Sequence, residues 1–207
     1  MAEHLYTYSD PPSERHLEKA VSLLEGDGVI AFPAGTSWAF GCHAASQKGL
    51  DRIRRLNPGH PKEKSFSLIC SDISMASSVG NIDHSLYRVL KKAWPGPYTI
   101  LVKRNRTLPR QIKDKRQVVG IRIPKCPMLL ALVAKFGHPI ATTSLPYKEE
   151  NTPYRMGYEV FDSFGHALDL VLDLGEQLIG MESTVVDYTS GMAEIIRVGA
   201  GDISIFG

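Results

Sequence analysis

The sequence predicts an α/β protein built on a mixed β-sheet. Short runs rich in β-branched and aromatic residues alternate along the chain with longer segments whose apolar residues recur at helical spacing. Glycine and proline mark the boundaries between these segments. No repeat, low-complexity segment or linker divides the 207 residues, so we expect a single domain over residues 1–207.

Capping residues and apolar spacing predict the helices. Residues 1–12 are expected to be a loose lead-in, and Pro127 and Gly137 suit the start and the end of a helix. Helices are expected after the cap residues Ser13, Ser46 and Asp83, over Met128 to Phe136 and, with a weaker pattern, over about 158–167.

Strands are expected where apolar, β-branched and aromatic residues cluster between breakers. They are Val29 to Phe32, Trp38 to Phe40, Ser65 to Cys70, Tyr98 to Val102, Val118 to Pro124, Ile140 to Ser144, Leu168 to Leu174, Ser183 to Tyr188 and Glu194 to Val198.

The stretch 28–43 organises this pattern. Pro33 should end the first strand because proline donates no hydrogen bond to a sheet. Gly35 permits backbone angles that let a loop approach a ligand closely. Thr36 and Ser37 add two hydroxyls at the mouth of the sheet. A plain strand–turn–strand connection also explains this stretch.

Composition narrows the class of protein. Hydrophobic residues make up 43% and charged residues 22% of the chain, as in soluble globular proteins, and no apolar run reaches the roughly 20 residues of a membrane span. No signal-peptide pattern opens the chain. Three widely spaced cysteines and scattered histidines predict a cytoplasmic protein without a disulfide framework or a metal site.

The net charge of +2 conceals an uneven distribution. Residues 1–148 hold 22 Lys and Arg against 11 Asp and Glu, a balance of +11, whereas residues 149–207 hold 2 Arg against 11 acids, a balance of −9. The positive charge is densest in one basic segment, which has two equally good explanations. It is either a solvated loop balanced by the acidic C-terminal third or a surface that binds tRNA or double-stranded RNA. That basic segment contains Lys103, Arg104, Arg106, Arg110, Lys113, Lys115 and Arg116.

Common catalytic motifs are missing: the sequence contains no P-loop, GxGxxG, GxSxG or HExxH. What remains is a set of strand ends that carry hydroxyls and arginines. Arg122 is the most informative, because an arginine within an apolar strand is costly unless it meets a carboxylate or phosphate. An internal pair with Glu182 or Asp187 is the alternative to a ligand.

Seven motifs in order, spanning about residues 15–205, resemble the YrdC/YciO family, the threonylcarbamoyl-AMP synthase superfamily of tRNA modification. They are PxxTxWxFG (33–41), SFSLIC (65–70), WPGPYTILV (94–102), VGIRIP (119–124), TTS (142–144), ESTVVD (182–187) and IIRVGAG (195–201). The TSL ending (143–145) and the run PRQIKDKRQVVGIRIP (109–124) are more similar to the YciO branch than to the synthases. The resemblance implies an open, twisted mixed sheet with helices packed on it around a large, positively charged cavity.

The resemblance also implies a reaction. L-threonine, bicarbonate and ATP, with Mg²⁺, would give threonylcarbamoyl-AMP and pyrophosphate, without a tightly bound cofactor. Positioning and charge neutralisation would perform most of this nucleotidyl transfer, so no residue is singled out as catalytic. The alternative is a diverged RNA-binding or nucleotide-binding protein with weak or no synthase activity.

Motif positions imply two groups of ligand-binding residues. The residues expected at the threonine or carbamate end are Thr36, Arg122, Ser183 and Thr184. The residues expected at the nucleotide are Arg55, Lys64, Ser144 and Arg197.

The sequence departs from the synthase pattern at several of these motifs. Ala34, Gly35 and Trp38 replace a threonine, an acid and a tyrosine of the first motif. Asn57 stands where the pattern has a phosphate-binding cation, so this cation is lost unless Lys62 or Lys64 substitutes for it. Pro146 replaces an asparagine after Ser144. These changes bear on the activity more than on the fold.

Overall fold

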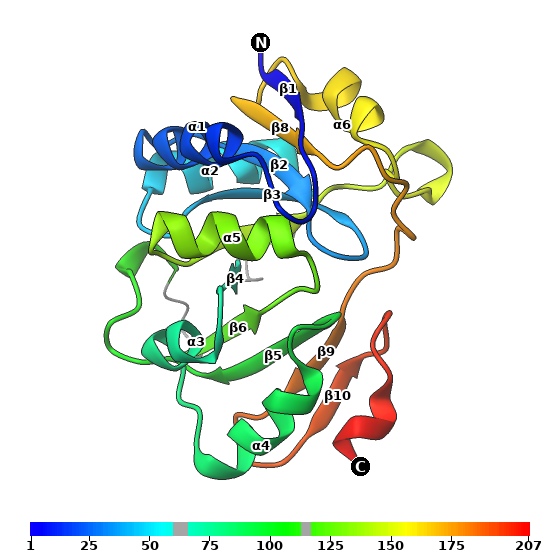
Figure 1. Ribbon diagram of the computed structural model, residues 1–207. Coiled ribbons are helices and arrows are strands. Elements are labelled where there is room, and N and C mark those ends of the chain that lie inside the picture. The colour runs from blue at the N-terminus through cyan, green and yellow to red at the C-terminus, as the bar shows by residue number, and fades with distance from the viewer. Residues whose placement is uncertain (60–65, 113–116) are drawn as a thin grey trace.

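In the part of the chain that the structure describes, ten strands form one mixed sheet in the order β1-β8-β2-β3-β7-β4-β6-β5-β9-β10 (Figure 1). The computed structural model describes residues 1–59, 66–112 and 117–207. The strands are β1 (Glu3–Tyr6), β2 (Ile30–Pro33), β3 (Trp38–His43), β4 (Ser67–Ile69), β5 (Tyr98–Lys103), β6 (Val118–Arg122), β7 (Ile140–Ser144), β8 (Leu170–Asp173), β9 (Thr184–Asp187) and β10 (Glu194–Arg197). The predicted mixed α/β architecture is confirmed.

The helices begin and end largely where the capping pattern predicts. Ser46 and Asp83 each accept a hydrogen bond from a backbone N–H three residues on, at 2.8 Å. Ser13 precedes its helix without such a bond. The helices are α1 (Glu14–Glu25), α2 (Gln47–Leu56), α3 (Ile73–Val79), α4 (His84–Ala93), α5 (Pro127–Phe136) and α6 (Gly157–Phe164), with short 3-10 turns η1 (Arg110–Ile112), η2 (Glu149–Asn151) and η3 (Ile203–Phe206).

Two elements differ from the sequence prediction. Residues 1–12 are not wholly loose, because Glu3–Tyr6 forms β1, which pairs in parallel with β8. Helix α3, capped by Asp72, has no counterpart among the predicted helices. The predicted strand from Ser65 begins outside the described residues, and its described part is β4.

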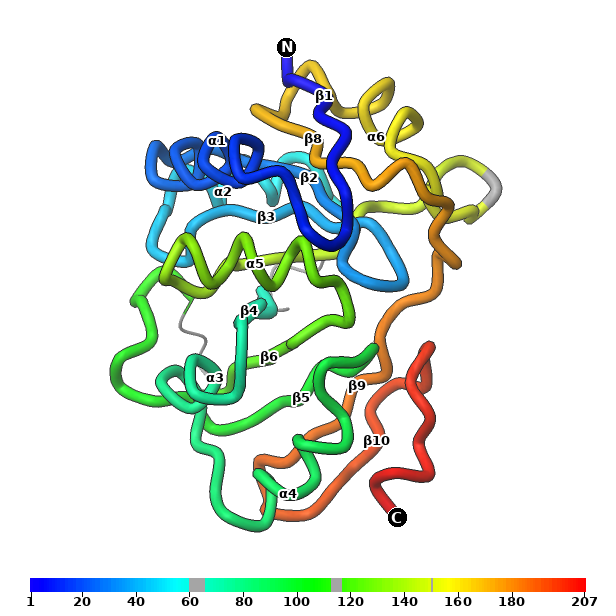
Figure 2. Tube along the Cα trace, viewed as in Figure 1, coloured from blue at the N-terminus to red at the C-terminus, as the bar shows by residue number. Residues whose placement is uncertain are grey.

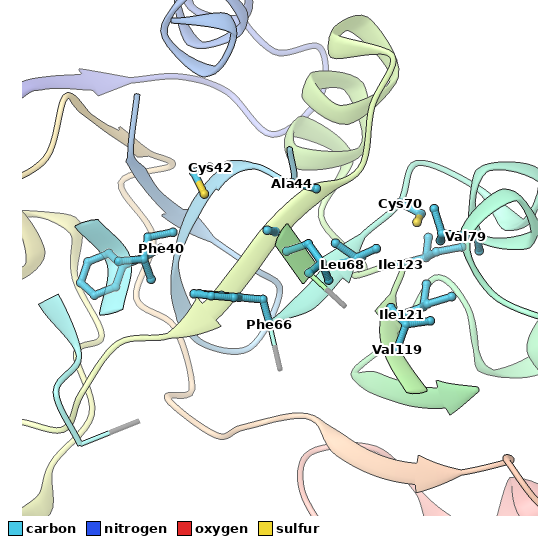
Figure 3. Packing of buried hydrophobic residues seen from close by; sticks show 14 of the residues in the cluster. Phe40, Cys42, Ala44, Phe66, Leu68, Cys70, Val79, Val119, Ile121 and Ile123 are labelled. Carbon is cyan, nitrogen blue, oxygen red and sulfur yellow. The ribbon is translucent and has the colours of Figure 1, made fainter. Parts of the chain in front are cut away.

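The two faces of the sheet are covered differently. On one face, α2, α3, α4 and α6 bury apolar residues against the sheet, and Figure 3 shows part of this cluster around Phe40, Leu68 and Ile121. On the other face, α1 and α5 cover the strands from β8 to β7. That second apolar cluster reaches β4 at Ile69, and none of its described residues comes from β5, β6 or β9.

Beyond Ile69, the second face carries more polar residues. Paired residues of neighbouring strands point to the same side of a sheet. The registers Ser67–Gly120 and Leu101–Gly120, together with alternation along β5 and β6, therefore place Leu101 and four further residues on one side: Ser67, Thr99, Gly120 and Arg122. We call these four residues the polar face. It provides the setting for the candidate site.

Candidate functional site

Arg122 ends β6 within the polar face and is 5% exposed. Its Nη2 donates a hydrogen bond to the carbonyl oxygen of Ala34 at 3.1 Å, and its buried Nε has no partner. Burial lowers the pKa of Arg122 to about 10, and the positive charge of Arg197 acts in the same direction, while Glu182 opposes both. Arg122 forms no ion pair with a carboxylate among the described residues.

The loop between β2 and β3 lies against the end of β6. Gly35 has a φ of 95°, and a Cβ placed on it would lie 3.7 Å from Cβ of Pro124. Thr36 donates through Oγ1 to the carbonyl oxygen of Met181 at 2.6 Å, and its own carbonyl oxygen accepts from N–H of Gly180 at 2.8 Å. Both hydrogen bonds fasten the loop to one distant segment, residues 180–181, and the hydroxyl proton of Thr36 is already used.

Arg197 lies on the last strand and is held by the backbone before β9. Its Nε and Nη2 both donate to the carbonyl oxygen of Ser183, at 3.2 and 2.9 Å. Its Nη1 pairs with the carboxylate of Glu182. The Ser183 hydroxyl in turn lies 2.7 Å from Oγ1 of Thr99, on the polar face. Arg122, Arg197 and Ser183 are thus brought together, and Glu182 pairs with Arg197 rather than with Arg122.

Thr184 has a different surrounding from Ser183. Its hydroxyl donates to the carbonyl oxygen of Gly201 at 2.8 Å and accepts from the N–H groups of Gly199 and Gly201, both at 3.0 Å. The side chain is completely buried. A hydroxyl with three such bonds is saturated, so the contacts of Thr184 fix the turn after β10.

Ser144 ends β7 beside a small, open pocket. Asn57, which follows α2, donates from Nδ2 to the carbonyl oxygen of Ser144 at 2.9 Å. Asn57 therefore fixes the end of β7 in place of the cation expected from the family pattern. The pocket is lined by Ser37, Trp38, Ser144, Leu145, Pro146, Tyr147, Pro153, Tyr154, Gly180 and Glu182.

The other two residues predicted to bind the nucleotide are Arg55 and Lys64. Arg55 is exposed near the end of α2, two residues before Asn57. Lys64 lies outside the described residues. Their expected roles therefore remain predictions.

The basic segment lies at the opposite end of β5 from Thr99. Lys103, Arg106 and Arg110 are exposed, and Arg104 is partly buried with Nε lacking a hydrogen-bond partner. None of the four forms an ion pair within the described parts of the chain. Lys103 also lines a second, open concavity with Asp83 and Ser85 at the start of α4. Lys113, Lys115 and Arg116 lie outside the described residues.

Two features are missing from the part of the chain that the structure describes. None of its helices is long and apolar enough to cross a membrane. It contains no group of three or more His, Cys, Asp or Glu side chains able to hold a metal ion.

Sequence reasoning missed several residues that shape the site. Thr99 and Ser67 reach it only through strand pairing, which no local pattern reveals. Tyr147 and Tyr154 enter through the loop after β7, which the sequence marks only by its proline and tyrosine content. The tyrosines of this loop are the one feature of the sequence that could have indicated its place at the site.

Fold and site together define an α/β protein with an arginine- and hydroxyl-bearing sheet face suited to anionic ligands. The family model for Sua5, YciO and YrdC proteins, described as "Telomere recombination", matches residues 22–199. The chain therefore belongs to the Sua5/YciO/YrdC family.

Similar proteins fall into two groups. An uncharacterised protein of Haemophilus influenzae is 34% identical and the uncharacterised protein YciO of Escherichia coli is 30% identical, each aligned over the full length of both chains. The crystal structure of E. coli YciO superposes with a TM-score of 0.92 over both whole chains. A threonylcarbamoyl-AMP synthase of Pyrococcus abyssi is 26% identical over 87% of this chain and 53% of the synthase.

Proposed function

We propose that this chain forms L-threonylcarbamoyladenylate from L-threonine, bicarbonate and ATP at the polar face. The supporting observation is Arg122, a buried guanidinium with an unpartnered Nε and no carboxylate paired with it among the described residues. A buried charge of this kind is costly unless a ligand compensates it. The proposal assigns that compensation to a carboxylate or carbamate of the substrate.

The neighbouring groups suit the rest of such a substrate. Arg197 offers a second guanidinium, fixed by two hydrogen bonds to the backbone, for a nucleotide phosphate. The Ser183 hydroxyl lies between Arg197 and the polar face. Thr184 contributes indirectly, by holding the turn after Arg197. Family membership is consistent with this chemistry, since the P. abyssi relative is a threonylcarbamoyl-AMP synthase and a P. abyssi Sua5 structure contains L-threonine.

In the proposed reaction, a carbamate oxygen of N-carboxythreonine bonds to the α-phosphorus of ATP, and the bond from that phosphorus to the bridging oxygen of pyrophosphate breaks. Mg²⁺ would enter as part of the Mg–ATP substrate. Arg122 would orient the carboxylate end, and Arg197 would offset negative charge at the phosphate. Such positioning and charge neutralisation are the main contributions a protein makes to phosphorus transfer.

The test is pyrophosphate release by purified protein supplied with Mg–ATP, L-threonine and bicarbonate. Wild-type protein should release pyrophosphate only when threonine is present. Arg122→Met should reduce the rate by about 100-fold, because it removes a preorganised positive group. Arg88→Met is the matched control, since Arg88 is exposed on α4. Absence of threonine-dependent release from folded wild-type protein would contradict the proposal.

RNA binding is the second candidate function. Its specific support is the exposure of Lys103, Arg106 and Arg110 without a paired carboxylate in the described residues. Exposed cations on one segment favour contact with phosphate backbones. This surface is separate from Arg122, so the two functions can be tested independently.

A further inference from the structure

The contacts of Arg197 and Glu182 indicate what occupies the anion site before a ligand binds. Two donors of Arg197, Nε and Nη2, share the carbonyl oxygen of Ser183. Only Nη1 pairs with Glu182. The backbone therefore holds the guanidinium in place whether or not Glu182 is present.

We propose that Glu182 is an internal counter-ion that occupies the anion position on Arg197 in the free protein and is displaced by a phosphate group of the ligand. The inference rests on the proposed anion site and is independent of the reaction proposed for it.

The Glu182–Arg197 pair is exposed enough to be exchanged. The side chain of Arg197 is 38% exposed and that of Glu182 is 29% exposed. Ion pairs with such access to water contribute little to stability, because solvent screens them and both side chains lose freedom. A phosphate group offers more charge and several acceptor oxygens to the same donors. It should therefore compete well with a single carboxylate.

The charges at the site indicate which ligands would compete. The charge of Arg197 is close enough to lower the pKa of Arg122, and among the described residues Glu182 is the carboxylate that acts on both arginines. The site holds one uncompensated positive charge while Glu182 stays, and two when it leaves. A ligand with two or more negative charges, such as a diphosphate, gains from the exchange, whereas a monocarboxylate needs only Arg122.

The displaced carboxylate can turn toward an open pocket beside it. Glu182 also lines the pocket that contains Ser37 and Ser144, two residues with hydroxyl donors. Rotation of the side chain from Arg197 toward this pocket would keep the carboxylate solvated. The exchange therefore does not require burial of an unpaired charge.

Glu182→Gln tests this exchange. The amide keeps the shape of the side chain and removes the competing charge. We expect the affinity for inorganic pyrophosphate, measured by calorimetry in metal-free buffer at low salt, to rise about five- to tenfold. Glu194→Gln is the matched control, because Glu194 is an exposed carboxylate on the same strand as Arg197 and loses the same charge. It should leave the affinity nearly unchanged.

Three results would overturn the inference: unchanged or weaker pyrophosphate binding in Glu182→Gln, an equal gain in Glu194→Gln, or no pyrophosphate binding by either the wild type or Glu182→Gln. L-threonine titrations on the same proteins should show little change. If Glu182→Gln binds pyrophosphate more tightly but wild-type protein makes no threonylcarbamoyladenylate, the inference stands and the proposed reaction fails. If the wild type is active but Glu182→Gln gains no affinity, the reaction stands and the inference fails.

Discussion

The guanidinium of Arg122 lies in the sheet with one hydrogen bond, to the carbonyl oxygen of Ala34. Burial lowers its pKa from the ordinary arginine value to about 10, so the folded state disfavours the protonated form. Arg122 is still protonated at neutral pH. A shift of this size corresponds to roughly 3 kcal/mol of lost stability below pH 10, and the loss is relieved as the pH rises from there toward the ordinary arginine value. A stability cost at a functional site is expected where a ligand later compensates the charge.

Arg122→Met should therefore stabilise the protein while strongly weakening ligand binding. Methionine fills similar volume without a charge, and replacing a poorly compensated buried ion with an apolar side chain gains about 1–3 kcal/mol. Urea unfolding measures the free energy, and Arg88→Met should change it by less than about 0.5 kcal/mol. Marked destabilisation by Arg122→Met would mean instead that the bond to Ala34 is a structural requirement of the loop between β2 and β3.

Some site residues could be predicted from sequence and others could not. Arg122 stands out because its strand neighbours are apolar. Glu182 is a reasonable partner for it on sequence grounds, yet the structure pairs Glu182 with Arg197. Thr184 follows Ser183 directly, and alternation along a strand sends the two hydroxyls to opposite faces. Which hydroxyl faces a ligand depends on register, and register is set by distant strands.

The pairing of β9 with β10 and the turn after them positions Arg197. Residues Glu194 and Ile195 pair with Asp187 and Val186, and the register then shifts before Arg197. After Arg197 the chain passes so close to β9 that a Cβ on Gly199 would lie 2.3 Å from the carbonyl oxygen of Glu182. Only glycine fits at such an approach. This close approach of two backbone segments explains why a glycine lies two residues after Arg197.

Gly199→Ala should push the turn away from β9. The contact is with backbone atoms, which cannot rotate aside, so we expect destabilisation of about 2 kcal/mol and weaker pyrophosphate binding through displacement of Arg197. Gly26→Ala is a control, because its Cβ would meet its nearest neighbour at an ordinary 3.4 Å. Urea unfolding and calorimetry give the two readouts. Unchanged stability in Gly199→Ala would show that the turn adapts.

Helices proved easier to predict than strand pairing. Ser46, Asp83, Pro127 and Gly137 mark helix ends with local chemistry, and the helices end at or near them. Strand β1 has no such signal: four residues become a strand only because β8 lies beside them. Helix α3 is short and carries several serines, so its apolar spacing is weak. Local sequence patterns therefore predict helix ends, whereas a strand such as β1 depends on pairing with residues far away in the sequence.

The topology distributes the C-terminal third of the chain over both ends of the sheet. Strand β8 lies beside β1, whereas β9 and β10 form the opposite end, near the C-terminus (Figure 2). Acids of this third have partners of their own: Asp169 pairs with Arg52 at 2.6 Å and Glu159 with Lys148 at 2.5 Å. No described cation of the basic segment pairs with any of them. Contacts in space therefore cancel part of the charge asymmetry along the sequence, but among the described residues none of them reaches the basic segment.

This leaves the basic segment available for RNA, and salt dependence can test it. The triple variant Lys103→Gln, Arg106→Gln, Arg110→Gln should weaken binding to tRNA and make the slope of log K against log salt shallower by about 2, since each phosphate contact on a single strand adds about 0.7.

A second triple variant, Arg88→Gln, Lys91→Gln, Lys92→Gln, removes the same charge from exposed residues of α4 and is the matched control. Fluorescence anisotropy over a salt series measures both slopes. An equal loss in the two variants would mean that net charge alone attracts RNA. No binding by the wild type at low salt would mean that the basic segment is a solvated loop, because counterion release would then have no phosphate contact to drive it.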